Sequence, residues 1–73
     1  MTAGRKHARY SHVYAIVRID LPVDESNPKN TVAIVKVISS EQLAEAETDR
    51  LNQINADKSC LYFTCITRMV YQN

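Results

Sequence analysis

The clearest pattern in the chain is an alternation of side chains over residues 11–21. Successive side chains of a strand point to opposite faces of a sheet, so a period of two predicts a strand here. One predicted face is mixed and includes Tyr14, Ile16 and Arg18. We expect the other face to be the core face because it is wholly apolar: Val13, Ala15, Val17, Ile19 and Leu21.

A second strand is predicted over residues 31–38, with Lys36 marking its outer face and Ala33, Val35 and Val37 facing the core. Residues 22–30 separate the two strands and contain two prolines among short polar side chains, which is typical of a loop. No helix fits in this segment, so the two strands are expected to pair in antiparallel fashion.

A helix is predicted over residues 41–55, after two serines that can each serve as its N-cap. If Ser39 is the cap, Gln42 stands at the capping-box position. Asn55 is suited to a left-handed C-cap. Glu47 falls within the apolar stripe and is expected to lean towards Arg50. The stripe that should face the sheet contains Leu43, Ala44, Leu51 and Ile54.

Residues 60–71 are rich in β-branched and aromatic side chains and predict a third strand. We expect Leu61, Phe63 and Cys65 to face the core. A helix of fifteen residues is ~22 Å long and returns the chain to the start of the second strand. The sequence therefore predicts an α+β fold of order strand–strand–helix–strand, with sheet order 2-1-3 and a right-handed crossover. Residues 1–10 form a flexible basic arm and residues 11–73 a single domain.

One helix covers only one face of such a sheet, and the other face is expected to be apolar as well. A monomer seldom exposes an apolar patch of more than a few hundred Å². Stacking two copies through this face would bury it, and two-fold dimers are the commonest assemblies. The alternative is that the arm and the 22–30 loop fold across it. The expected interface residues are Tyr14, Ile16, Ile34, Lys36, Tyr62, Ile66 and Arg68.

Composition narrows the class of protein without naming a function. The chain has 73 residues, 45% hydrophobic and 23% charged, with a net charge of +1, which fits one small globular domain. No apolar run approaches the ~18 residues of a membrane helix. The N-terminal segment also lacks the apolar region of a secretory signal, so we expect a cytoplasmic location with reduced cysteines.

Candidate chemistry is sparse. Cys60 and Cys65 are five residues apart, so on one strand they point to opposite faces and cannot form a disulfide. Together with His7 and His12 they match no common zinc spacing. A cysteine–histidine nucleophile would need a shaped pocket, for which the chain offers a single glycine, Gly4. We therefore expect no enzymatic activity, no metal and no cofactor.

Nucleic-acid binding is the competing hypothesis. The arm carries Arg5, Lys6, His7 and Arg9, and Tyr14 and Tyr62 are candidates for stacking on bases. Phosphate contacts would come from Arg18, Lys36 and Arg68. The aromatic–glycine signature of sheet-surface RNA binders is absent, and eight acidic residues nearly balance the nine basic ones.

The stretch VKVISSEQLAEAETDRLNQINADKSCLYFTCITRMV, residues 35–70, resembles small uncharacterised bacterial domains of strand–strand–helix–strand order. In these domains a serine-capped helix with an AEAE…RLN pattern is followed by an aromatic strand. The resemblance implies an α+β fold and a bacterial origin. It implies no activity and assigns no functional residue.

Overall fold

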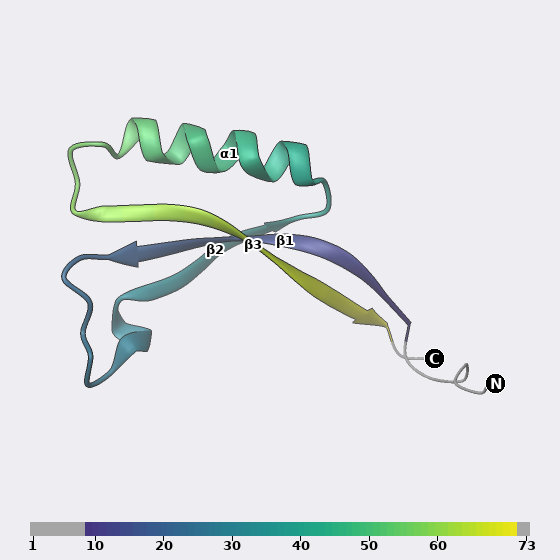
Figure 1. Cartoon of the computed structure of the whole chain (residues 1–73), viewed down its shortest axis with the longest axis horizontal. Coiled ribbons are helices and arrows are strands. Elements are labelled where there is room, and N and C mark those ends of the chain that lie inside the picture. Colours follow the sequence, from purple (N-terminus) through teal and green to yellow (C-terminus); the bar gives the residue numbers. More distant parts are fainter. Residues whose placement is uncertain (1–8, 72–73) are drawn as a thin grey trace.

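The computed structural model of the chain describes residues 9–71 and has two layers, a three-stranded sheet and one helix (Figure 1). The sheet order is β2-β1-β3, and β1 is antiparallel to both neighbours. The predicted α+β class, element order and sheet order are therefore confirmed. The elements are β1 Arg9–Asp20, η1 Pro28–Asn30, β2 Val32–Ile38, α1 Glu41–Ile54 and β3 Cys60–Tyr71.

The strands differ in length, and this shapes one end of the molecule. β1 and β3 pair from Arg9↔Tyr71 to Asp20↔Cys60, whereas β2 reaches only as far as Tyr14 of β1. The segments 9–13 and 67–71 therefore form a two-stranded ribbon that projects beyond the helix (Figure 1). Arg9 and Tyr10 belong to this ribbon rather than to the predicted arm, and residues 1–8 of that arm lie outside the described part of the chain.

A β-bulge interrupts the pairing of β1 with β2. Ile16 pairs with Lys36, but the next residue, Val17, pairs with Ile34, so Val35 is an extra residue on β2. An extra residue breaks the alternation of side chains between the two faces. Ile34 and Lys36 consequently lie on opposite faces of the sheet, and the prediction that they share one face is wrong.

The helix covers the mixed face of the sheet, the opposite of the predicted one. Thr48 of α1 is hydrogen-bonded to Thr64 of β3, with 2.7 Å between their hydroxyl oxygens. Thr64 and Lys36 both pair with Ile16, so the three side chains share a face. Ile16 is 0% exposed and is the largest fully buried side chain. The core therefore forms around Ile16 and the inward helix residues Ala44, Thr48 and Leu51.

Pairing of polar groups explains this choice of face. The mixed face presents a lysine and a threonine, and the helix supplies Glu47 and Thr48 to bond them. Thr48 is buried, so its hydroxyl would cost free energy without the Thr64 partner, and Lys36, whose side chain is 43% exposed, gains Glu47 as a partner. The predicted helix stripe is correct for Ala44 and Leu51 but wrong for Leu43 and Ile54, which are exposed.

The two ends of the helix test the predicted caps. Ser40 is the N-cap, and its Oγ accepts a hydrogen bond from the Leu43 N–H at 3.3 Å. Asn55 has φ −112°, so it is not in the predicted left-handed conformation. It closes the helix instead through its side-chain Nδ2, which donates to the Leu51 carbonyl at 2.8 Å.

Candidate interaction face

The face of the sheet away from the helix, which we name the helix-free face, is apolar across all three strands. Opposite residues in an antiparallel pair share a face, so the register identifies its members. From Val13 to Ile19 of β1, no charged side chain falls on it. Its members are Val13, Ala15, Val17 and Ile19 of β1, Val32, Ile34 and Val37 of β2, and Leu61, Phe63, Cys65 and Thr67 of β3.

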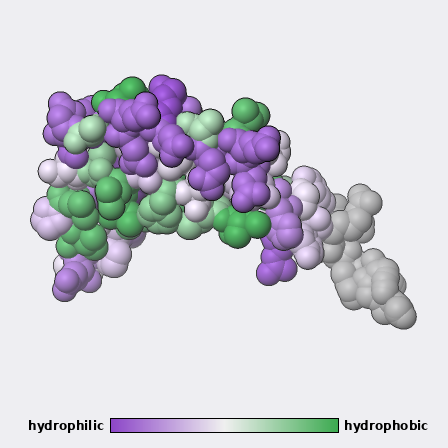
Figure 2. All heavy atoms as spheres, turned by 45° about the horizontal axis from the view of Figure 1, so that its top comes forward, coloured by the Kyte–Doolittle hydropathy of each residue, from purple (hydrophilic) through white to green (hydrophobic). Residues whose placement is uncertain are grey.

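The outer strands carry the exposed part of this face. Ile34 is 66% exposed, Leu61 53% and Val37 50%. The central Ala15 and Val17 are buried because larger side chains of both neighbouring strands flank them. Figure 2, which views the molecule from the helix side, shows that hydrophilic residues predominate over α1 and that hydrophobic residues gather along the part of the sheet visible below it. The helix-free face thus has a buried centre on β1 and an exposed apolar margin on the two outer strands.

The structure separates the residues that the sequence predicts as one interface. Ile34 lies on the helix-free face. Ile16 is fully buried beneath the helix, so it is wrong as an exposed contact residue. The face assignment of the predicted set is therefore corrected, because the bulge and the position of the helix reverse it. The side chains that lie on the helix-covered face are Tyr14, Ile16, Lys36, Tyr62, Ile66 and Arg68.

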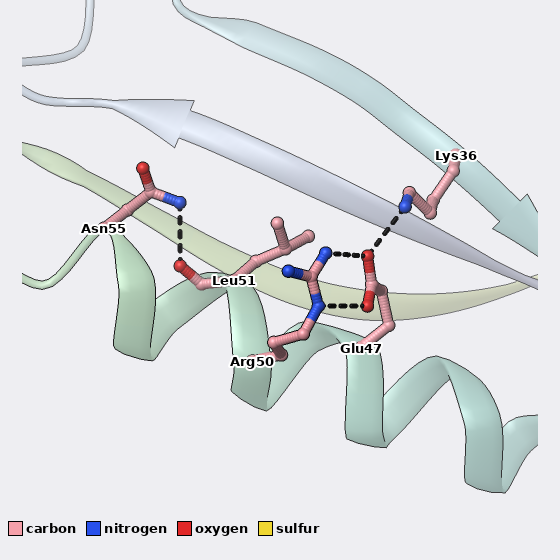
Figure 3. Close-up of polar contacts among 5 residues, drawn as sticks. All are labelled: Lys36, Glu47, Arg50, Leu51 and Asn55. Carbon is pink, nitrogen blue, oxygen red and sulfur yellow. Dashed lines mark hydrogen bonds and ion pairs between the residues drawn. The ribbon is translucent and has the colours of Figure 1, made fainter.

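A charged cluster joins the helix to β2 (Figure 3). Glu47 Oε2 lies 2.6 Å from Lys36 Nζ and 2.7 Å from Arg50 Nη2, and Arg50 Nε donates to Glu47 Oε1 at 2.7 Å. Hydrogen bonds from Arg50, then from Lys36, lower the pKa of Glu47 to about 2. The predicted contact of Glu47 with Arg50 is confirmed, and Lys36 is a structural partner of the helix.

We expect the ion pairs of Glu47 to make the folding stability of the chain depend on pH in the acid range. The pKa of Glu47 is depressed in the folded chain, so its contribution is present above its unfolded value of 4.5 and is lost as the pH falls towards 2. We expect Glu47→Gln to lower the urea midpoint modestly at pH 7, because solvent screens such pairs. The difference from wild type should shrink between pH 4.5 and pH 2. Asp49→Asn, at an exposed helix position, is the control; an equal loss there would contradict this role.

Asn52 closes part of the outer edge of β3. Its Nδ2 donates to the Tyr62 carbonyl at 2.9 Å, and its Oδ1 accepts from the Tyr62 N–H at 2.9 Å. An edge strand presents unpaired backbone groups, and here a helix side chain satisfies them at one residue. Sequence reasoning missed this role for Asn52. The only signal was a polar residue next to Leu51, on the inward side of an amphipathic helix.

The projecting ribbon carries a small aromatic and basic group. The Arg68 guanidinium lies 5.1 Å from the centre of the Tyr10 ring, a cation–π distance, and Tyr10 makes an edge contact with His12. Tyr14 and Tyr62, predicted as base-stacking residues, are half-buried on the helix-covered face. The structure therefore does not place them together as an open stacking surface.

Cys60 and Cys65 pair with Asp20 and Ala15, so they lie on opposite faces as predicted. Within residues 9–71, no group of three or more His, Cys, Asp or Glu side chains is placed to hold a metal ion. In the same part of the chain, no helix has the length and apolar character needed to cross a membrane.

Comparisons of the chain with protein-family profiles, with curated protein sequences and with solved structures find no match. The bacterial resemblance therefore stays a prediction.

Proposed function

We propose that this chain is an assembly module that associates with a second copy of itself through the helix-free face. The observation that carries the proposal is the absence of any charged side chain on this face between Val13 and Ile19 and along the paired segments of β2 and β3. The opposite face does contain charges: Lys36 is paired with Glu47 of the helix, and Arg18 is paired with Asp20 of its own strand. The charged side chains of the central sheet thus lie on the helix-covered face, and the helix-free face has none.

Covering the exposed margin of the helix-free face would stabilise an assembly. Complete burial of a large apolar side chain is worth ~1.5–3 kcal/mol. Ile34, Val37 and Leu61 are each at least half exposed, so covering them regains roughly half of that amount for each. A second copy offers the same apolar surface, and sheets pack about 10 Å apart through such faces. A chain of 73 residues gains much from this burial because its own core is small.

Sedimentation equilibrium of the reduced wild-type chain tests the proposal. We expect a mass of at least two chains at micromolar concentration, with dissociation on dilution. The mass should be insensitive to salt, because apolar contacts are not screened. A mass of one chain at every concentration up to the millimolar range would contradict the proposal.

Nucleic-acid binding is the second candidate function, and the contact of Arg68 with Tyr10 favours it. The projecting segments 9–13 and 67–71 contain two arginines and no acidic residue. The support is narrower than for assembly, because the other tyrosines are half-buried and Lys36 is paired with Glu47. Binding to mixed DNA and RNA at low salt, weakening steeply as salt rises, would establish it.

The proposed location is the cytoplasm. Cys60 and Cys65 are free thiols on opposite faces, which suits a reducing compartment.

A further inference from the structure

The outer edge of β3 is open along most of its length. The Tyr62 backbone bonds Asn52, so its N–H and carbonyl point away from β1. The β1–β3 register has no bulge, and backbone direction alternates along a strand. The same outward direction therefore holds for Thr64, Ile66, Arg68 and Val70. In residues 9–71, no side chain bonds the backbone of these four residues.

The two edges of the sheet are protected differently. β2 has seven residues and a bulge, both of which discourage pairing with another strand. β3 has twelve residues, no proline and, from Cys60 to Tyr71, a single charged side chain, Arg68. Long, regular edges of this composition are the ones that accept another strand.

We propose that the β3 edge from Thr64 to Val70 pairs in antiparallel fashion with the same edge of a second copy, about a two-fold axis at Thr67. The inference rests on the proposed function for the identity of the partner, a second copy of this chain. The pairing segment is bounded by Asn52, which occupies the Tyr62 backbone, and by the end of β3 at Tyr71. Thr67 lies at its centre.

In this register, each β3 residue whose backbone N–H and carbonyl point outward pairs with a residue of the same kind in the partner. Thr64 pairs with Val70 of the partner subunit, and Ile66 with the partner's Arg68. On the helix-free face, Thr67 meets the partner's Thr67, Cys65 meets the partner's Met69 and Phe63 meets the partner's Tyr71. Threonine pairs and aromatic pairs are favourable across strands.

Neighbouring registers are poorer. An axis at Ile66 requires the Tyr62 backbone, which Asn52 already bonds. An axis at Arg68 sets that charge directly opposite its copy, and like charges in this position are destabilising. If the partner's strand is shifted by a single residue, backbone groups that point outward would lie opposite backbone groups that point back towards the partner's own β1. The axis at Thr67 is therefore the register that uses the whole open edge.

The helix does not obstruct this pairing. α1 follows β2 and reaches the β3 edge through Asn52, at Tyr62. In the single chain α1 lies over only one half of β3 (Figure 1). The proposed register places this helix-covered half beside the projecting half of the partner's β3, so the two helices would be staggered along the strands. The sheets then form one continuous sheet with both helices on the same side. Its helix-free face has twice the apolar area, which assists the proposed stacking.

Disulfide trapping tests the register. The two copies of Thr67 would form a non-hydrogen-bonded pair of an antiparallel ladder. The Cα atoms of such a pair are about 4.5 Å apart, within the range of a disulfide. We expect Thr67→Cys, in a full-length chain with Cys60→Ser and Cys65→Ala, to form a covalent dimer with oxidised glutathione. Met69→Cys in the same background should not: Met69 is exposed on the same face as Thr67, but its two copies lie about 14 Å apart along the paired strands. No covalent dimer from Thr67→Cys, or equal yields at both positions, would overturn the register.

Proline substitution tests the backbone contact. The Arg68 N–H faces outward, so Arg68→Pro removes a donor to the partner without removing one from the β1–β3 ladder. We expect at least a tenfold loss of Thr67→Cys crosslinking with Arg68→Pro and little change with Arg68→Ala. Circular dichroism checks that both variants are folded. Retained crosslinking in a folded Arg68→Pro variant would overturn the proposal.

The two contacts fail separately in these experiments. If stacking is absent and edge pairing present, Ile34→Asp leaves the mass unchanged while Thr67→Cys still crosslinks. If edge pairing is absent and stacking present, Thr67→Cys does not crosslink while Ile34→Asp lowers the mass.

Discussion

Ile34→Asp is expected to weaken association through the helix-free face by at least about 100-fold, which corresponds to roughly 3 kcal/mol. Ile34 is 66% exposed in the single chain, so a carboxylate is hydrated there and the fold tolerates it. In the stacked assembly the same position is covered by apolar side chains. A carboxylate without a partner in such an environment costs several kcal/mol, and the assembly separates instead. Sedimentation equilibrium over a dilution series measures the change.

Leu43→Asp provides the matched control for Ile34→Asp. Leu43 is 64% exposed, nearly the same as Ile34, but it lies on the helix. An acidic residue in the first helical turn is favourable to the helix dipole, so this variant should fold and assemble as wild type does. Equal dissociation of both variants would show that the loss comes from added charge and not from the helix-free face.

Ile16→Ala is expected to produce the largest loss of folding stability. Ile16 is 0% exposed and lies where β1, both neighbouring strands and the helix meet. Removing a buried isoleucine costs about 2–5 kcal/mol, from lost burial and from the cavity left behind. A chain of 73 residues has a total stability of roughly 4–11 kcal/mol. The variant should therefore lose a large fraction of it, and urea unfolding at matched protein concentration measures this loss.

Ile54→Ala is the control for the core substitution. Ile54 is 59% exposed in the last turn of the helix, and alanine is a better helix former than isoleucine. Its free energy of unfolding should change by less than about 1 kcal/mol. Should Ile16→Ala be as stable as Ile54→Ala, the core would not lie between the helix and the mixed face.

The topology could be predicted from the sequence, because it depends on local signals. Prolines and short polar residues marked the loop, a serine marked the helix start, and the helix length determined the direction of β3. These signals do not depend on which face of the sheet the helix covers. Strand order and chain direction could therefore be predicted without knowing which face of the sheet the helix covers.

The faces could not be predicted, for two physical reasons. The bulge at Val35 shifts the alternation of β2 by one residue, and no residue type in that segment announces it. Both faces of β1 also contain apolar side chains, so hydrophobicity alone did not distinguish them. The pairing of Thr48 with Thr64 and of Glu47 with Lys36 decided between the faces. Such partners become apparent only when helix and sheet are placed together.

The most direct test of the central claim is an isotope-filtered NOE experiment on a mixture of labelled and unlabelled wild-type chains. It reports only contacts between different copies. If the helix-free face is the assembly surface, intermolecular NOEs will connect the methyl groups of Ile34, Val37 and Leu61 with side chains of the same face. Their absence from an associated sample, or intermolecular NOEs from Leu43 and Ile54 instead, would contradict the claim.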